Sequence, residues 1–205
     1  EKALNEFCNN TGVPVGETQA GKGAIPWNHS QSLGAVGVTG TSAANIISRD
    51  ADLVICIGTR LSDFTTASKT LFQHSEVLFL SINVSPFDAH KHSSISLVGD
   101  AKKILETLNH ILKNDGFSIS VKYRAEIKQQ KNNWNQEVDK IFNLNNEPAV
   151  SQGEVIGLIS DCMTKDDTVV CAAGSLPGDM HKLWRTVNGN QYHMEYGYSC
   201  MGYEI

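Results

Sequence analysis

Apolar residues occur along the chain both as short unbroken runs and as longer stretches with helical spacing. The clearest run, from Leu53 to Ile57, has five apolar residues in succession, three of them β-branched. Such a run is typical of a buried strand that is covered on both faces. Similar runs predict further strands at 13–15, 77–83, 95–98 and 167–172. Helices are predicted at 1–10, 42–50, 67–74, 101–114, 121–142, 151–159 and 180–185.

Several residues between these stretches are suited to begin or end a helix. Gly12 predicts the end of the first helix, because glycine readily adopts the left-handed conformation of a C-cap. Thr41 is suited to cap the second helix, and Ser151 with Glu154 has the spacing of a capping box. The alternation of strands and helices predicts an α/β fold with a Rossmann-like, doubly wound and mostly parallel sheet.

The pattern divides the chain into two predicted domains. Residues 1–149 form the first, with a core at about 1–115, a linker at 116–120 and a long, sparsely apolar helix at 121–142. Residues 150–205 have only the opening elements of a second α/β domain, so we expect this part to be incomplete and, in isolation, poorly ordered. Because the chain also begins at Glu1 inside a predicted helix, we expect it to be a piece of a longer protein.

Composition excludes several classes of protein. The formal net charge is −5 without a block of like charges, which argues against nucleic acid or a membrane surface as the main partner. No apolar run approaches the ~20 residues of a membrane span, and no signal peptide is recognisable. The five cysteines are scattered and odd in number, which indicates free thiols in a reducing compartment and hence a cytoplasmic protein.

Most candidate motifs have an ordinary structural explanation. Residues 21–23, Gly-Lys-Gly, lack the spacing of a phosphate-binding loop, so we interpret the two glycines as shaping a turn. Residues 174–175, Gly-Ser, lack the second glycine of a nucleophile elbow. The histidines at 74, 90, 92 and 110 have no common metal-ligand spacing. His181 and His193 are better candidates, because each follows a turn or strand of the second part.

Several glycine-containing segments resemble the central domain of thiamine-diphosphate-dependent enzymes of the acetohydroxyacid synthase group. They lie at residues 21–26, 33–41, 51–60 and 99–102. Two later segments, 174–184 and 192–204, are more specific and are similar to the members that hydrolyse a cyclic dione in myo-inositol catabolism. The resemblance covers nearly the whole chain. It implies that residues 1–149 are the central domain and residues 150–205 the start of the diphosphate-binding domain.

The resemblance implies a cofactor site of which this chain holds a part. The implied cofactor-binding residues are Met180, His181, Ser199, Cys200, Met201 and Gly202. Met201 matches the apolar residue that keeps the cofactor bent, although without the surrounding motif it would be an ordinary core methionine. Ser199 departs from the usual glycine. The activating glutamate and the Mg²⁺-binding motif fall outside this chain, so no catalytic residue and no metal ligand is assigned.

The implied activity is that of a whole thiamine-diphosphate- and Mg²⁺-dependent hydrolase. It would open the ring of a cyclic trihydroxy-1,2-dione by C–C bond cleavage to 5-deoxy-glucuronate, as a homo-oligomer, a dimer or tetramer. We expect the 205 residues alone to be inactive. Two alternatives stay open. One is a carboligase or decarboxylase of the same superfamily. The other is a module that binds ADP or a flavin at the polar tip 59–63, although an ordinary exposed loop also explains this tip.

Overall fold

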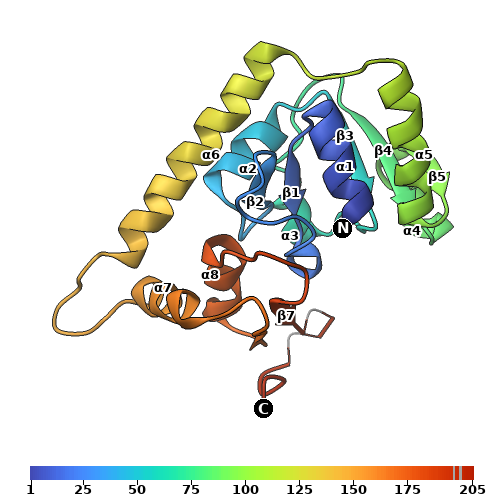
Figure 1. Cartoon of the computed structure of the whole chain (residues 1–205). Coiled ribbons are helices and arrows are strands. Elements are labelled where there is room, and N and C mark those ends of the chain that lie inside the picture. The colour runs from blue at the N-terminus through green and yellow to red at the C-terminus, as the bar shows by residue number, and fades with distance from the viewer. Residues whose placement is uncertain (196, 199) are drawn as a thin grey trace.

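The computed structural model describes residues 1–195, 197–198 and 200–205, and its strands alternate with helices along the chain (Figure 1). The strands are β1 Val15–Glu17, β2 Ser32–Ala35, β3 Leu53–Ile57, β4 Leu78–Asn83, β5 Ile95–Val98, β6 Val169–Cys171 and β7 Tyr192–Met194. The helices are α1 Lys2–Thr11, α2 Ser42–Arg49, α3 Asp63–Thr66, α4 Pro86–Ala89, α5 Ala101–Asn114, α6 Val121–Phe142, α7 Gln152–Cys162 and α8 Ser175–Leu183, with 3₁₀ turns η1 Gln19–Gly21 and η2 Lys91–Ser93.

The strands pair in three groups, and each pairing is parallel. β1 pairs with β2, β6 pairs with β7, and β3, β4 and β5 form a three-stranded sheet in that order. Side chains of β1 and β3 pack into one core with Phe7 of α1 and Leu105 of α5, so these helices cover one face of the strands. The parallel strands with intervening helices confirm the predicted α/β fold.

Local sequence signals place the helix ends correctly. Gly12 ends α1 in a left-handed conformation at φ 77°, as the C-cap prediction requires. The Thr41 hydroxyl accepts the Ala44 N–H at the start of α2. Ser151 and Glu154 form the predicted capping box. Each signal depends on residues within one helical turn, which explains why the sequence alone reveals it.

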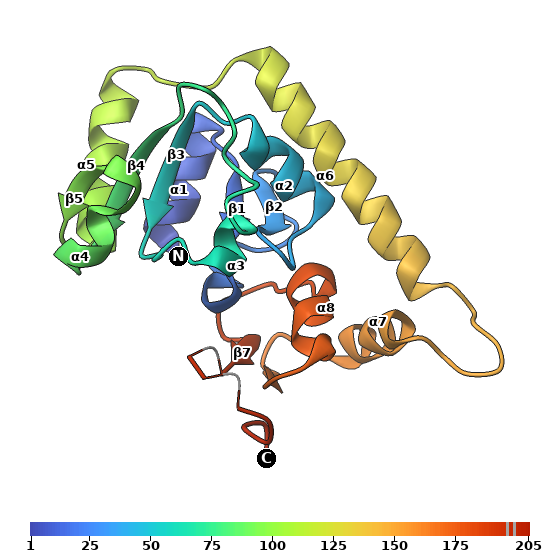
Figure 2. The same ribbon diagram turned by 180° about the vertical axis from the view of Figure 1, so that it is seen from behind.

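Helix α6 connects the two parts of the molecule. It runs along one side of the structure, from the linker after α5 to the loop before α7 (Figures 1 and 2). Ile127, in its first half, packs with α2 and β2, whereas Val138, in its second half, packs with α7 and α8. Trp134 contacts both clusters. The long helix therefore belongs to two cores. No helix within the described residues is long and apolar enough to cross a membrane.

The prediction of a helix at 67–74 is wrong, and with it the prediction that β3 is covered on both faces. The helix is instead one turn, α3, after which Ala67, Ser68, Lys69 and Phe72 adopt positive φ angles. On the face of β4 that carries Phe79, the rings of Phe72 and His92 pack over the sheet. Of the five residues of β3 only Cys56 is buried, and Leu53 at its start is 48% exposed.

The expectation that the elements beyond residue 149 cannot bury their apolar faces is only partly right. One face of α7 and of α8 packs on α6, whereas Val155, Leu158 and Ile159 of α7 remain exposed. The second sheet has only two strands in the described residues. Ile156, Met180, Leu183 and Trp184 are all buried. The missing cover is supplied by the second half of α6 and by the first part of the chain.

Candidate functional site

The predicted pair on α8 lies inside the molecule. Met180 packs in the apolar cluster with Val138 and Ile156. His181 is 1% exposed, and both ring nitrogens are engaged: Nδ1 lies 2.8 Å from the Thr39 hydroxyl and Nε2 lies 3.1 Å from the Glu17 carbonyl oxygen. Burial, with the nearby Lys22 charge, lowers the pKa of His181 to about 3, so the imidazole is neutral.

The predicted residues near the end of the chain lie on an exposed turn. Cys200 and Met201 are exposed, and the space beside Gly202 is open where a side chain would project. The Glu195 carboxylate shapes this turn by accepting the N–H groups of Tyr198 and Cys200, each at 2.8 Å. Ser199 lies outside the described residues. Both ribbon views show the turn projecting from the body, away from α8 (Figures 1 and 2).

The two groups of predicted residues, at 180–181 and at 200–202, differ in how well they fit a thiamine diphosphate site. The turn at 200–202 offers an exposed methionine and open space, as an apolar support beneath a ligand requires. Met180 and His181 offer a ligand nothing in this conformation, because their side chains are buried and the imidazole nitrogens are already paired. Their contribution to diphosphate binding stays a prediction, and it would require movement of α8.

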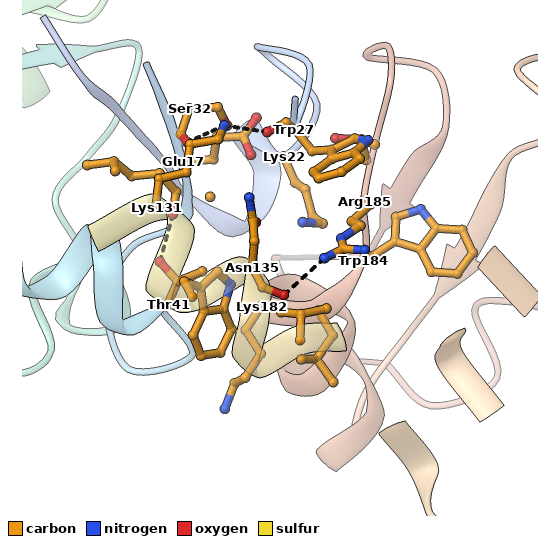
Figure 3. A pocket seen from close by; sticks show the side chains of 16 residues that line it. Glu17, Lys22, Trp27, Ser32, Thr41, Lys131, Asn135, Lys182, Trp184 and Arg185 are labelled. Atoms are coloured by element: carbon orange, nitrogen blue, oxygen red, sulfur yellow. Dashed lines mark hydrogen bonds between the residues drawn. The ribbon is translucent and has the colours of Figure 1, made fainter. Parts of the chain in front are cut away.

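A small polar pocket lies where β1, β2, α6 and α8 meet. Figure 3 shows Lys131 directed toward Trp27 and Ser32, and Arg185 toward Asn135. Its volume is about 40 Å³, room for roughly three water molecules at ~10–15 Å³ each. A nucleotide or thiamine diphosphate does not fit this space. The lining residues include Glu17, Lys22, Trp27, Thr41, Lys131, Trp134, Asn135, Lys182, Trp184 and Arg185.

Glu17 and Lys22 place opposite charges in the interior beside this pocket. The Glu17 carboxylate accepts the N–H groups of Gly23 at 2.8 Å and Ile25 at 3.4 Å, while burial raises its pKa. Burial lowers the pKa of Lys22 to about 8, and the Glu17 charge opposes this shift. The Lys22 ammonium donates to the His181 carbonyl at 2.9 Å. A residue of the first part thereby binds α8 of the second.

Lys131 fastens α6 to the loop before β2. Its ammonium donates to three backbone carbonyls, those of Trp27 at 2.7 Å, His29 at 2.5 Å and Ser32 at 3.0 Å. Arg185, after α8, stacks on the Trp27 ring at 4.5 Å and pairs with Asp139 at 2.7 Å. Lys131 of α6 and Arg185 after α8 therefore both contact the loop of the first part that contains Trp27.

Sequence reasoning missed the roles of Glu17, Lys22 and Lys131. Lysine and glutamate are ordinarily solvated, and nothing in the local pattern marks these as buried. The interpretation of residues 21–23 as a turn agrees with the structure: Gly23 has φ +91°, and a Cβ there would meet the Asn188 carbonyl at 3.0 Å. Lys22 is engaged in the interior, so it is not available to a phosphate group.

The polar tip after β3 is a turn at the carboxyl end of the sheet. Gly58 has φ +64°, and Asn83 at the end of β4 donates its amide to the Thr59 carbonyl at 3.3 Å. Two neighbouring strand ends are thereby joined at the edge where open α/β sheets bind ligands. The tip 59–63 thus begins as an ordered polar turn at that edge.

The fold and these segments define a class of protein. The family described as thiamine pyrophosphate enzyme, central domain, matches residues 1–108, and the chain belongs to this family. Among its relatives is the 3D-(3,5/4)-trihydroxycyclohexane-1,2-dione hydrolase of Clostridium botulinum (strain Alaska E43 / Type E3), 46% identical over 99% of this chain and 35% of the relative.

Proteins of the same name from two further organisms are similar over nearly the whole chain. The identity is 42% for Clostridium tetani (strain Massachusetts / E88), over 100% of this chain, and 44% for Bacillus anthracis, over 98%. In each case the chain spans 35% of the relative's length. The resemblance inferred from the motifs is therefore confirmed.

Proposed function

We propose that this chain is part of a thiamine-diphosphate-dependent hydrolase that opens a cyclic trihydroxy-1,2-dione. The main support for this proposal is the 46% identity, over 99% of the chain, to a relative whose name describes this hydrolase activity. The match extends well beyond the central domain at residues 1–108. In this proposal residues 1–149 are the central domain and residues 150–205 begin the diphosphate-binding domain.

The proposed reaction consumes one water and breaks one C–C bond of the ring, and the product is 5-deoxy-glucuronate. Thiamine diphosphate, when bound, supplies the carbanion chemistry that makes such a cleavage accessible. This chain would contribute the turn at 200–202, with Met201 as the apolar support and Glu195 as the group that shapes the turn. Mg²⁺, a homo-oligomeric assembly and a cytoplasmic role in myo-inositol breakdown belong to the same proposal.

An assay of the whole protein tests the proposal. Full-length protein is incubated with the cyclic dione, with and without thiamine diphosphate and Mg²⁺, and the product is identified by mass. We expect 5-deoxy-glucuronate only when the cofactor is present, and none from the 205 residues alone. Formation of a new C–C bond or release of CO₂ would instead identify a carboligase or decarboxylase.

The proposed position of Met201 beneath the cofactor predicts a loss of activity in the same assay when this side chain is removed. Met201→Ala removes the side chain that is 86% exposed here and that would lie beneath the cofactor. We expect kcat to fall about 10-fold or more, on the order of 1.4 kcal/mol, with little change in thermal stability. Unchanged kcat would contradict the assigned role. Titration of the same protein with ADP and flavin tests the alternative of a nucleotide-binding module.

A further inference from the structure

A continuous series of hydrogen bonds runs between the two parts of the chain through buried and partly buried side chains. The Tyr192 hydroxyl donates to Gln19 Oε1 at 3.3 Å, and Gln19 Nε2 donates to the Thr39 hydroxyl, also at 3.3 Å. Thr39 Oγ1 lies 2.8 Å from His181 Nδ1, and His181 Nε2 lies 3.1 Å from the Glu17 carbonyl oxygen. Gln19 is therefore joined on one side to β7 and, through Thr39, on the other side to α8.

The Glu17 carbonyl at the end of this series determines which group donates in each of the hydrogen bonds. A carbonyl oxygen only accepts, so Nε2 of His181 must carry the proton toward Glu17. In the neutral ring Nδ1 is then the acceptor, and the Thr39 hydroxyl donates to it. Thr39 oxygen accepts from the Gln19 amide nitrogen, which leaves the Gln19 amide oxygen facing the Tyr192 hydroxyl. One tautomer of the imidazole satisfies the whole series.

Most of the series lies in the interior. Gln19, His181 and Tyr192 are each buried, whereas Thr39 between them is partly exposed. The cavity lined by Gln19, Thr39 and His181 among others has a volume of about 10 Å³, the lower limit for a single water molecule. A weaker contact places the Tyr192 hydroxyl 3.7 Å from the Met194 sulfur, and the Cys171 thiol donates to Tyr192 at 3.5 Å.

We propose that Gln19 is a positioning residue. By donating to the Thr39 oxygen it leaves the Thr39 hydroxyl proton free for Nδ1, which supports the Nε2–H tautomer that the Glu17 carbonyl requires, and it links β7 and α8 to the central domain. An amide offers a donor and an acceptor on one planar group without titrating, and the two sides require one of each. Tyr192 begins β7, and the turn at 200–202 follows this strand in the sequence. Resting on the proposed function, this positioning extends to the segment that would support the cofactor.

The tautomer is measured directly by NMR of the 205-residue chain with ¹⁵N-labelled histidine. We expect His181 to show a protonated Nε2 and an unprotonated Nδ1 from pH 5 to 8, with slow exchange of the Nε2 proton. Gln19→Glu keeps the shape but removes the donor to Thr39, and we expect exchange at least 10-fold faster or a mixture of tautomers. Gln129→Glu, at an exposed site on α6, is the control.

Two further variants keep the test decisive if Gln19→Glu fails to fold. Thr39→Val removes the hydroxyl that donates to Nδ1, whereas Thr39→Ser retains it, so only the serine variant should preserve the wild-type His181 signals. A wild-type ring protonated at Nδ1, or identical His181 signals in Thr39→Val and Thr39→Ser, would overturn the proposal.

The link to the cofactor has a separate measurement in the full-length protein. We expect Gln19→Glu to raise the Kd for thiamine diphosphate about 10-fold, and Gln129→Glu to leave it unchanged. A shifted His181 spectrum with an unchanged Kd would overturn the link between Gln19 and the cofactor segment. A wild-type protein that binds no thiamine diphosphate would overturn the proposed function instead, while the NMR result alone would still decide the role of Gln19.

Discussion

At the scale of the residue, the surroundings of His181 determine its chemistry. The sequence marks it as a histidine beside a glycine-containing turn, in a segment shared with a family of cofactor-dependent enzymes. In the structure its ring is buried with both nitrogens paired, Lys22 donates to its carbonyl, and Lys182 follows it on α8. Burial disfavours a charged ring, and protonation would also place a second charge beside buried Lys22, so the lowered pKa of His181 leaves the ring neutral.

The buried imidazole predicts a loss of stability in acid. The pKa of His181 is lowered to about 3, against ~6.5 in an unfolded chain. Between these values the unfolded state binds a proton that the folded state does not, so the free energy of unfolding falls as pH decreases from about 6.5 toward 3. His181→Gln removes the titrating group, and we expect its stability to fall less steeply over this range in denaturant titrations.

The control for this prediction is His110→Gln, which removes an exposed histidine from α5. We expect its pH dependence to follow that of the wild-type chain. Both variants retain Glu17 and Lys22, so the comparison tests the contribution of the His181 imidazole. If the free energies of unfolding of His181→Gln and of the wild-type chain fell in parallel as the pH decreases, His181 would be protonated in the folded state.

At the scale of the element, predictions succeeded where the deciding contacts are local. Thr41 and Ser151 bond within the first turn of their own helices, so residue type and spacing reveal them. The segment 67–74 depends on distant groups, since the Gln73 N–H donates to the Arg49 carbonyl at 2.6 Å and Phe72 packs on Phe79. The helix α6 was predicted correctly, but its sequence does not distinguish Lys131 from its exposed lysines, because Lys131 bonds to carbonyls about a hundred positions earlier.

The attachment of α6 predicts that Lys131 contributes more to stability than its neighbours on the helix. Lys131→Met keeps most of the side-chain length but removes the side-chain donor from the Trp27, His29 and Ser32 carbonyls, of which that of His29 still accepts the Ser32 N–H. We expect the free energy of unfolding to fall by about 2 kcal/mol or more, since each unsatisfied buried group costs ~1–3 kcal/mol. Lys128→Met, at an exposed site on the same helix, should change it by less than ~0.5 kcal/mol. Equal effects of the two substitutions, measured by denaturant unfolding, would contradict the role of Lys131.

At the scale of the whole molecule, the two parts share an interface that is both apolar and polar. The apolar share is the cluster of α6, α7 and α8 around Val138 and Ile156. The polar share includes Lys22, Gln19 and Thr39, which bind the second part from the first. The sequence predicted the two domains but not this interface, because its members lie about 150 positions apart and no local pattern relates them.

Such an interface predicts that the second part is ordered within the 205-residue chain. We expect the interior amides of α7 and α8 to exchange as slowly as those of α2, and the exposed loop at 143–149 to exchange rapidly. Ile156→Ala should open a cavity beneath α7, cost about 2–5 kcal/mol and speed exchange in α7 and α8. Leu158→Ala, at an exposed site on the same helix, should leave exchange unchanged. Rapid exchange throughout 150–195 in the wild-type chain would instead mean that the interface does not hold the second part, and that its order requires the rest of the longer protein.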